Sequence, residues 1–185
     1  MLDDVYTDMK ARMEKTIAAL EKELRRIRTG RAAPAILDGL QASYYGTPTP
    51  LAQMASISVP DPRTLLIQPW DMAMLGEIEK VILKSDLGLT PQNDGKAVRI
   101  AIPILSKERR RELAKSVAKT AEEAKISLRG VRRDANETIK ELKNSKEISE
   151  DDQKKGEAKV QAAVKQFTDK VDALARDKEK EIMEL

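Results

Sequence analysis

The 185-residue sequence contains no cysteine and no histidine. The first absence excludes disulfides and thiol nucleophiles, and the second excludes imidazole general bases; together they remove the usual ligands of zinc and iron. Carboxylates alone can in principle support catalysis, but no segment concentrates them in apolar surroundings. We therefore expect no catalytic residue, no metal and no cofactor, and predict that the protein is not an enzyme.

Aromatic residues are also scarce, at 3% of the chain. No hydrophobic run approaches the roughly 20 residues that a membrane-spanning helix needs. The N-terminal residues Met1–Asp4 are acidic and resemble neither a signal peptide nor an arginine-rich transit segment. We expect a cytoplasmic monomer without a membrane partner.

The sequence is rich in charge, because 35% of its residues are charged and 41% are hydrophobic. This balance is typical of long, solvent-exposed helices with thin cores, and the hydrophobic share is too large for a disordered chain. The net charge is only +3. Any binding of nucleic acid must therefore depend on a local basic patch.

Three segments have apolar residues at the helical spacing of three and four positions: residues 2–29, Ser106 to about Asn144, and Ser149 onwards. The first is expected to end at Gly30, since glycine adopts the left-handed conformation that follows many helices. Ser149–Asp152 predicts a capping box for the third helix. Its heptad positions are Val160, Val164, Phe167, Val171, Leu174, Lys178, Ile182 and Leu185.

All eight prolines lie between Pro34 and Pro103, in a region that has few charges in its first half. Such sequence cannot continue a charged helical bundle, so residues 31–104 are predicted to form a separate inserted domain. Strands are expected near residues 40–45, 56–59, 64–68 and 98–102, with turns at 46–48, 60–62 and 93–95 and a short helix after Asp71. We expect Trp70, and at least one of Tyr44 and Tyr45, to pack in the interior.

The predicted fold is α+β. It is a three-helix bundle of residues 1–29 and 106–185, with a small β/α/β domain inserted at residues 31–104. Both junctions must lie at the same end of the bundle, so hinges are expected at Gly30 and Arg31 and at Pro103, Ile104 and Leu105. The result would be an elongated, two-armed molecule.

The segment Leu128–Asn136 carries the clearest functional signal. Arg129, Arg132 and Arg133 gather away from the apolar stripe and point outward, as expected of a surface that meets an anion. A solvated basic face is the alternative, and it is the commoner explanation of an isolated arginine cluster. A second basic group lies at the hinge end and comprises Arg25, Arg26, Arg28, Arg31, Arg109, Arg110 and Arg111, the last three with functional and ordinary roles equally open.

Several segments, taken in order along the whole chain, resemble the ribosome recycling factor family. They are Arg28–Pro34, Tyr44–Leu51, Val59–Leu65, Ser85–Pro91, Asn93–Lys96, Arg132–Asn136 and Lys146–Asp151. The resemblance implies an L-shaped factor, similar to tRNA in outline, that binds the ribosome after peptide release. With elongation factor G and GTP it would split the ribosome into subunits, so that ribosomes and mRNA are recycled.

The resemblance also implies the site. Arg129, Arg132 and Arg133 would contact large-subunit rRNA, with Arg28 and Arg31 as further contacts, and the inserted domain would face elongation factor G and the subunit interface. Guanidinium groups on a rigid helix suit phosphate recognition, whereas the scarcity of aromatics disfavours base stacking. The chain has no Gly-rich P-loop, which agrees with GTP hydrolysis by the partner.

Two positions depart from the family. Relatives usually have consecutive prolines where this chain has a single one, Pro103, and a larger side chain at the position of Gly130. The alternatives from other functional classes are a scaffold protein with a helical bundle, and a generic RNA-binding chaperone without recycling activity.

Overall fold

A computed structural model describes residues 1–184 and divides them into two compact units. Unit 1 comprises Met1–Ile27 and Glu108–Glu184, and unit 2 comprises Arg28–Lys107. Leu185, the last predicted heptad position, lies outside the described residues.

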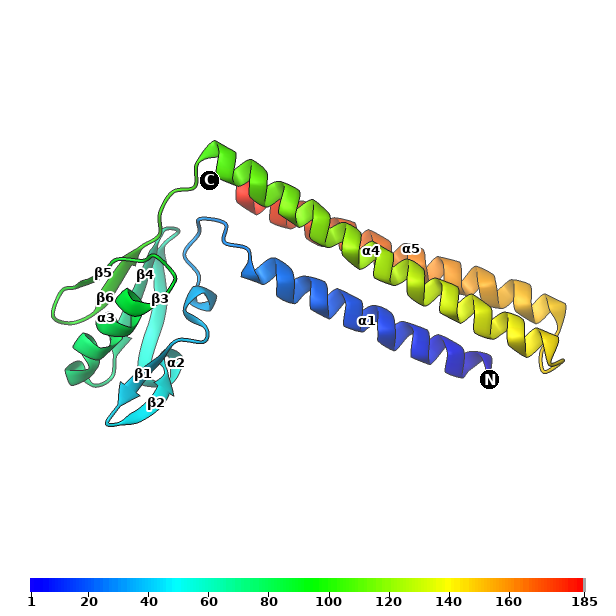
Figure 1. Ribbon diagram of the computed structural model, residues 1–185, viewed down its shortest axis with the longest axis horizontal. Helices are drawn as coiled ribbons and strands as arrows, with labels where there is room; N and C mark the ends of the chain where they lie inside the picture. The colour runs from blue at the N-terminus through cyan, green and yellow to red at the C-terminus, as the bar shows by residue number, and fades with distance from the viewer. Residues whose placement is uncertain (185) are drawn as a thin grey trace. The chain divides into compact units, whose positions relative to one another are not determined.

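Unit 1 consists of three long helices, α1 (Leu2–Arg26), α4 (Lys107–Asn144) and α5 (Glu150–Met183). They lie side by side, with α4 and α5 joined by a short loop and α1 running antiparallel to α4 (Figure 1). A single core fills the space between them, and in it the predicted stripe of α5 is confirmed at Val160, Val164, Phe167, Val171 and Ile182. The unit is therefore a three-helix bundle.

The predicted capping box of α5 is confirmed. The Ser149 hydroxyl accepts a hydrogen bond from the Asp152 backbone N–H at 3.0 Å, and the Ser149 N–H donates to Asp152 Oδ2 at 3.1 Å. Each residue satisfies a donor that the helix itself leaves unpaired. The first turn of α5 is thereby fixed directly after the loop.

Helix α1 ends earlier than predicted, at Arg26 instead of residue 29. Ile27 is already extended, with ψ of 117°. The next residues belong to unit 2: the Arg28 guanidinium donates to the Leu87 carbonyl at 2.9 Å, and Thr29 is buried. These tertiary contacts replace the last predicted helical turn, and Gly30, at φ of +80°, is left-handed in a connecting segment, not at a helix end.

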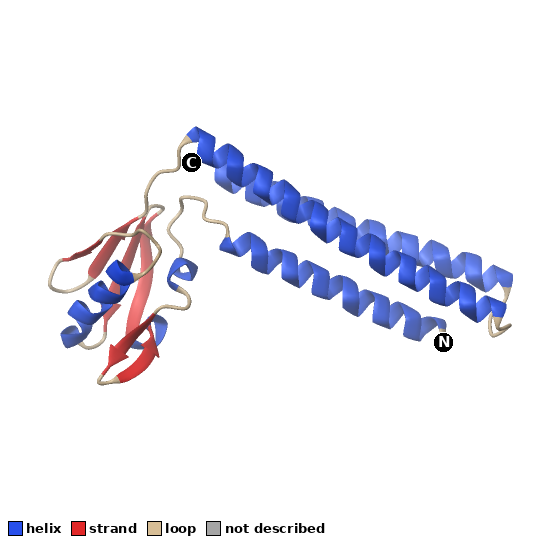
Figure 2. Ribbon diagram, viewed as in Figure 1, coloured by secondary structure: helices blue, strands red, loops and turns tan. Residues whose placement is uncertain are grey.

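Unit 2 is built on a four-stranded antiparallel sheet in the order β3–β4–β6–β5 (Figure 2). The strands are β3 (Ala55–Asp61), β4 (Thr64–Pro69), β5 (Pro91–Asn93) and β6 (Val98–Ala101). Helix α3 (Leu75–Lys84) buries Ile78 and Ile82 in the same core as Leu65, Ile67 and Ile100. This core is separate from that of the bundle.

A two-stranded ribbon of β1 (Gln41–Tyr44) and β2 (Thr47–Pro50) extends unit 2, followed by the short helix α2 (Leu51–Met54). Short 3-10 turns, η1 (Pro34–Leu37) and η2 (Met72–Met74), complete it. The predicted turn at residues 46–48 is wrong, because Thr47 and Pro48 belong to β2 and the turn is Tyr45-Gly46. Proline is tolerated in β2 because the strand lies at an edge.

The interior position predicted for Trp70 is also wrong, since 70% of this residue is exposed. Tyr45 is 71% exposed and Tyr44 is 38% exposed, so neither tyrosine packs in the core as expected. Strand β1 is short and belongs to a ribbon outside the main sheet. Alternation along it therefore does not lead into a second buried face.

The two segments that connect unit 2 to the helices are both anchored on the β3–β4 turn. The Ala32 N–H donates to the Pro62 carbonyl at 2.7 Å, and the Ile102 N–H donates to the Arg63 carbonyl at 2.8 Å. Beyond these anchors, residues 102–106 form no helix or strand, and Ile104 is 65% exposed. The entry and exit segments of unit 2 therefore leave it side by side.

Candidate nucleic-acid interface

The segment Leu128–Asn136 lies in the interior of α4. Leu128, Val131 and Ala135 are all buried in the bundle core, as their spacing predicts. This inward face fixes the orientation of the helix, so the intervening side chains are held at its surface. The backbone beneath the arginine cluster is thus rigid.

The three arginines of this segment have different surroundings. Arg129 pairs with Glu122 on its own helix, Nη2 to Oε1 at 3.0 Å. Arg132 is half-buried and lies towards α5, where its Nη1 is 3.5 Å from Gln161 Oε1. The Arg133 side chain is exposed and makes no hydrogen bond or ion pair with any residue from 1 to 184. An exposed ion pair contributes about 0–1 kcal/mol, so a phosphate can displace Glu122 at little cost.

Gly130 lies beside these arginines and leaves the backbone open. A Cβ atom added there would have no other atom within 4 Å. Ile126, four residues earlier on the same side of the helix, is 57% exposed. The surface around Arg129 and Arg133 thus includes an uncovered stretch of helix backbone and one apolar side chain. Sequence reasoning missed Ile126, although its spacing to Gly130 and Arg133 was a usable signal.

The remaining predicted site residues belong to unit 2. Arg28 donates to the Leu87 carbonyl, whereas Arg31 is exposed and has no bond to another described residue. Some residues of the second basic group form ion pairs with nearby acids: Arg26 pairs with Glu23 at 3.3 Å, and Arg109 pairs with Glu112 at 2.9 Å. Arg110 is half-buried, and its Nε has no hydrogen-bond partner.

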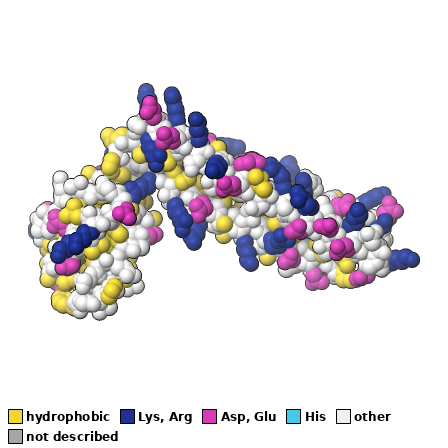
Figure 3. All heavy atoms as spheres, viewed as in Figure 1, with side chains coloured by type: hydrophobic (Ala, Val, Ile, Leu, Met, Phe, Trp, Pro, Cys, Tyr) yellow, Lys and Arg dark blue, Asp and Glu magenta, His cyan; other side chains and the backbone are white. Residues whose placement is uncertain are grey.

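The surfaces of the two units differ in charge. On the face shown in Figure 3, Lys and Arg alternate with Asp and Glu over the helices, while most of the sheet unit is uncharged. Within residues 1–184 there is no cluster of three or more acidic side chains arranged to hold a metal ion. No helix in this range is long and apolar enough to cross a membrane.

Comparison with known proteins places the chain in a family. Residues 20–183 match the family model described as ribosome recycling factor. The chain is 54% identical to a ribosome-recycling factor of Syntrophobacter fumaroxidans over 185 residues, covering 100% of both chains. It is also 54% identical to the ribosome-recycling factor of Nitratidesulfovibrio vulgaris over 184 residues, covering 100% of this chain and 99% of the other.

Two solved structures agree with this. The solution structure of a ribosome recycling factor matches with a TM-score of 0.79 and 36% identity, covering 100% of this chain and 98% of the other. A second match, with a TM-score of 0.67 and 44% identity, covers 99% of both chains. It is the T. thermophilus ribosome recycling factor, described with E. coli elongation factor G as bound to the E. coli post-termination complex. By sequence along its whole length and by fold, this chain belongs to the ribosome recycling factor family.

Proposed function

We propose that this protein binds the post-termination ribosome and, with elongation factor G and GTP, splits it into subunits, so that ribosomes and mRNA are recycled. The observation that carries the proposal is the end-to-end match, at 44% identity, to a factor described as bound to the post-termination complex together with elongation factor G. The protein acts in the cytoplasm as a non-enzymatic translation factor. GTP hydrolysis is the task of the partner.

The ribosome contact is made by α4. Arg129, Arg132 and Arg133 meet the phosphates of large-subunit rRNA, and the exposed, unpaired Arg133 supports this role most directly. Guanidinium groups bind phosphate oxygens in a bidentate manner. Arg28 and Arg31 provide further contacts from unit 2. Because the contact is to RNA backbone, binding weakens steeply with salt.

The hinge consists of Gly30 and Arg31 in the entry segment and Pro103, Ile104 and Leu105 in the exit segment. It separates the bundle of residues 1–29 and 106–185 from the inserted domain of residues 31–104. Two features support it: the left-handed φ of +80° at Gly30, and the absence of regular structure from residue 102 to 106. Both segments are anchored on the sheet side by the carbonyls of Pro62 and Arg63. Bending would then be confined to a short double connection.

The decisive experiment is the conversion of polysomes to subunits, measured by sucrose-gradient sedimentation with and without this protein. Full conversion is expected only when the protein, elongation factor G and GTP are all present. A scaffold protein would not sediment with ribosomes, and a generic RNA chaperone would bind free RNA equally well. Either result, or conversion that does not depend on the protein, would exclude recycling activity.

The arginine contact is tested by Arg132→Ala and Arg133→Ala in ribosome co-sedimentation at several salt concentrations. Each variant should lose affinity. The slope of log K against log salt concentration is negative, and its magnitude should decrease by about 1 for each phosphate contact removed. Arg176→Ala is the matched control, because Arg176 is an exposed arginine of α5 with no described partner. Helicity should be unchanged in all three variants. Equal affinities for the variants and the control would refute the assignment of the site.

A further inference from the structure

Three of the chain's aromatic side chains lie exposed at one end of unit 2. Trp70 is 70% exposed, Tyr45 is 71% exposed and Tyr44 is 38% exposed, and nearby Met72 is 48% exposed. Tyr44 and Tyr45 contact each other edge to face, with ring centroids 4.8 Å apart. Large apolar side chains exposed close to one another often mark a place where another molecule binds.

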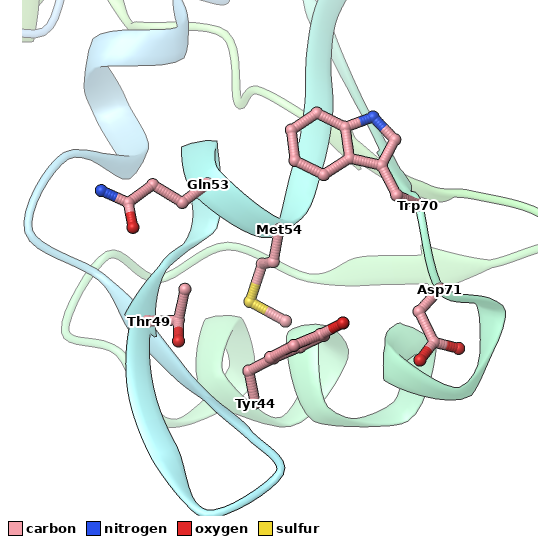
Figure 4. Close-up of a pocket in the computed structure, with 6 residues that line it drawn as sticks. All are labelled: Tyr44, Thr49, Gln53, Met54, Trp70 and Asp71. Carbon is pink, nitrogen blue, oxygen red and sulfur yellow. The ribbon is translucent and has the colours of Figure 1, made fainter.

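A hollow of about 270 Å³ opens between the rings of Trp70 and Tyr44. It is lined by Tyr44, Thr49, Gln53, Met54, Trp70 and Asp71. We call it the Trp70–Tyr44 hollow. In Figure 4 the rings of Trp70 and Tyr44 lie on opposite sides, Met54 lies between them, and the Asp71 carboxylate stands at one end. The rings come from β1 and from the residue that follows β4, so the hollow depends on the fold of the whole unit.

Asp71 is the only charged side chain that lines the hollow. No lysine or arginine occurs between Arg31 and Arg63, or between Arg63 and Lys80, so the local sequence supplies no counterion. The Tyr45 hydroxyl donates to Asp71 Oδ2 at 2.5 Å and the Ala73 N–H donates to Oδ1 at 3.0 Å. These bonds hold the pKa of Asp71 below its usual range, so the carboxylate is charged at neutral pH. It retains acceptor sites, because a carboxylate has about four.

The backbone of Tyr45 adopts an unusual conformation, and the Tyr45 hydroxyl bonds to the Asp71 carboxylate. Its φ is +48°, in the left-handed region, and Gly46 follows at +85°. Asn-Gly or Asp-Gly normally occupies such hairpin turns, and a bulky residue there is strained. Here the strained position directs a phenol hydroxyl to Asp71. Backbone strain of this kind concentrates at binding sites.

We propose that the Trp70–Tyr44 hollow binds a cationic side chain, arginine or lysine, presented by a protein partner. Cations bind over the faces of Trp and Tyr rings, and a carboxylate at one end of the hollow supplies the opposite charge. Exposed aromatic rings also stack on bases, but an RNA ligand would bring phosphates to a surface that has a carboxylate and no cation. The proposal gives unit 2 a protein-binding site distinct from the RNA contact of α4.

The test uses the free full-length protein, so its result does not depend on recycling activity. Trp70 is the only tryptophan in the chain, and its fluorescence therefore reports on the hollow alone. The probe is the blocked peptide acetyl-Gly-Arg-Gly-amide, compared with the same peptide carrying neutral citrulline in place of arginine. At about 10 mM, above the Kd of about 1 mM expected for so small a ligand, the arginine peptide should give a saturating change.

Variants locate the binding. Asp71→Asn should weaken the arginine peptide by about tenfold or more, since a charge-assisted hydrogen bond is lost. Asp38→Asn is the matched control, an exposed acid of the same unit that does not line the hollow, and it should leave affinity unchanged. Two-dimensional NMR spectra of each variant establish that unit 2 remains folded. Tyr45→Phe, which keeps the carboxylate but removes its partner, should have a smaller effect.

The proposal is overturned if the arginine peptide leaves Trp70 fluorescence unchanged, or if the citrulline peptide binds equally well. It is also overturned if Asp71→Asn, correctly folded, binds as tightly as the unaltered protein. Quenching of Trp70 by a uridine oligonucleotide, with no response to the arginine peptide, would identify the hollow as a base-stacking surface.

Discussion

On the helices of unit 1, basic and acidic side chains alternate at the surface, whereas one end of unit 2 presents exposed aromatic rings around a single carboxylate. The ion pairs of the bundle include contacts between helices, such as Arg12 with Asp134 at 2.7 Å and Lys125 with Asp172 at 2.5 Å. Exposed pairs contribute little stability each and exchange readily with other ions. The rings of unit 2 are uncharged, and the Tyr45 hydroxyl is bonded to Asp71.

As proposed, the molecule combines two kinds of recognition. Arginines on a rigid helix bind phosphates through contacts that salt weakens, and they require no change in the helix. The hollow of unit 2 combines ring contacts, which depend only weakly on salt, with a single charge pair at Asp71, so its binding should weaken less with salt than a contact to several phosphates. The charged unit therefore suits RNA and the aromatic end suits a protein. The following changes test the separation, in order of expected effect.

The largest effect should come from Ile67→Ala, which empties part of the sheet core. Ile67 is fully buried in β4, and such a truncation costs about 2–5 kcal/mol. Because the two cores are separate, only unit 2 should unfold earlier on heating. Trp70 fluorescence reports on unit 2, and far-UV circular dichroism is dominated by the long helices of unit 1. Loss of both signals together at a lower temperature would show that the units do not unfold separately.

The reciprocal variant is Leu128→Ala in the bundle core, where Leu128 is also fully buried. It should destabilise unit 1 by a similar free energy, so the transition followed by far-UV circular dichroism should occur at a lower temperature. The transition followed by Trp70 fluorescence should be unchanged. The pair of variants thus provides a control for each reporter.

A smaller effect is expected at two helix glycines of unit 1 that have opposite surroundings. A Cβ at Gly156 would lie 3.1 Å from the Tyr6 hydroxyl and 3.2 Å from Ile139 Cδ1, so Gly156→Ala should crowd the contact of all three helices. Overpacking costs about 1–3 kcal/mol, which exceeds the helix propensity gained with alanine. Chemical denaturation should show a net loss of stability. A stabilised variant would mean that Tyr6 and Ile139 move aside freely.

Gly130→Ala should act in the opposite direction, because a Cβ there meets no other atom within 4 Å. A stabilisation of up to about 1 kcal/mol is expected from helix propensity. The same variant tests the arginine surface. If the RNA backbone approaches α4 at this point, ribosome affinity should fall although stability rises. Unchanged affinity would leave Gly130 without a role in binding.

The helices were predictable because each buries a stripe at a fixed spacing. Leu128, Val131 and Ala135 face the core as that spacing requires, and the neighbouring arginines do not. The end of α1 was not predictable, because it is decided by contacts of Arg28 and Thr29 within the other unit. Local sequence favours helix as far as Gly30, and tertiary contacts override it.

The aromatic end of unit 2 was the least predictable part. A turn was predicted at residues 46–48, but Thr47 and Pro48 belong to an edge strand, and this shifts the turn to Tyr45-Gly46. Trp70 looked like a core residue because tryptophan is usually well buried. Its exposure follows from its place just beyond β4, where the chain leaves the sheet. The hollow arises only when the ribbon and this segment come together in the fold.

The smallest effect is expected from Tyr45→Phe. It is measured by comparing the titration of one carboxylate in each unit, Asp71 in unit 2 and Asp152 in unit 1. The pKa of Asp71 is held below its usual range, first by the Tyr45 hydroxyl, and that of Asp152 is lowered first by the Ser149 hydroxyl. A carboxylate whose pKa is lower in the folded than in the unfolded protein stabilises the fold at pH values above its unfolded-state pKa. This contribution is lost as the pH falls through its folded-state pKa. Tyr45→Phe should therefore raise the pKa of Asp71 towards its ordinary value and leave that of Asp152 unchanged, as measured by NMR titration of the carboxyl carbons. Conversely, Asp71→Asn should lower the pKa of Tyr45, which the same hydrogen bond raises. If neither pKa responds to removal of its partner, the hydrogen bond that fixes the carboxylate of the hollow does not persist in solution, and Asp71 is then free to turn away from a bound cation.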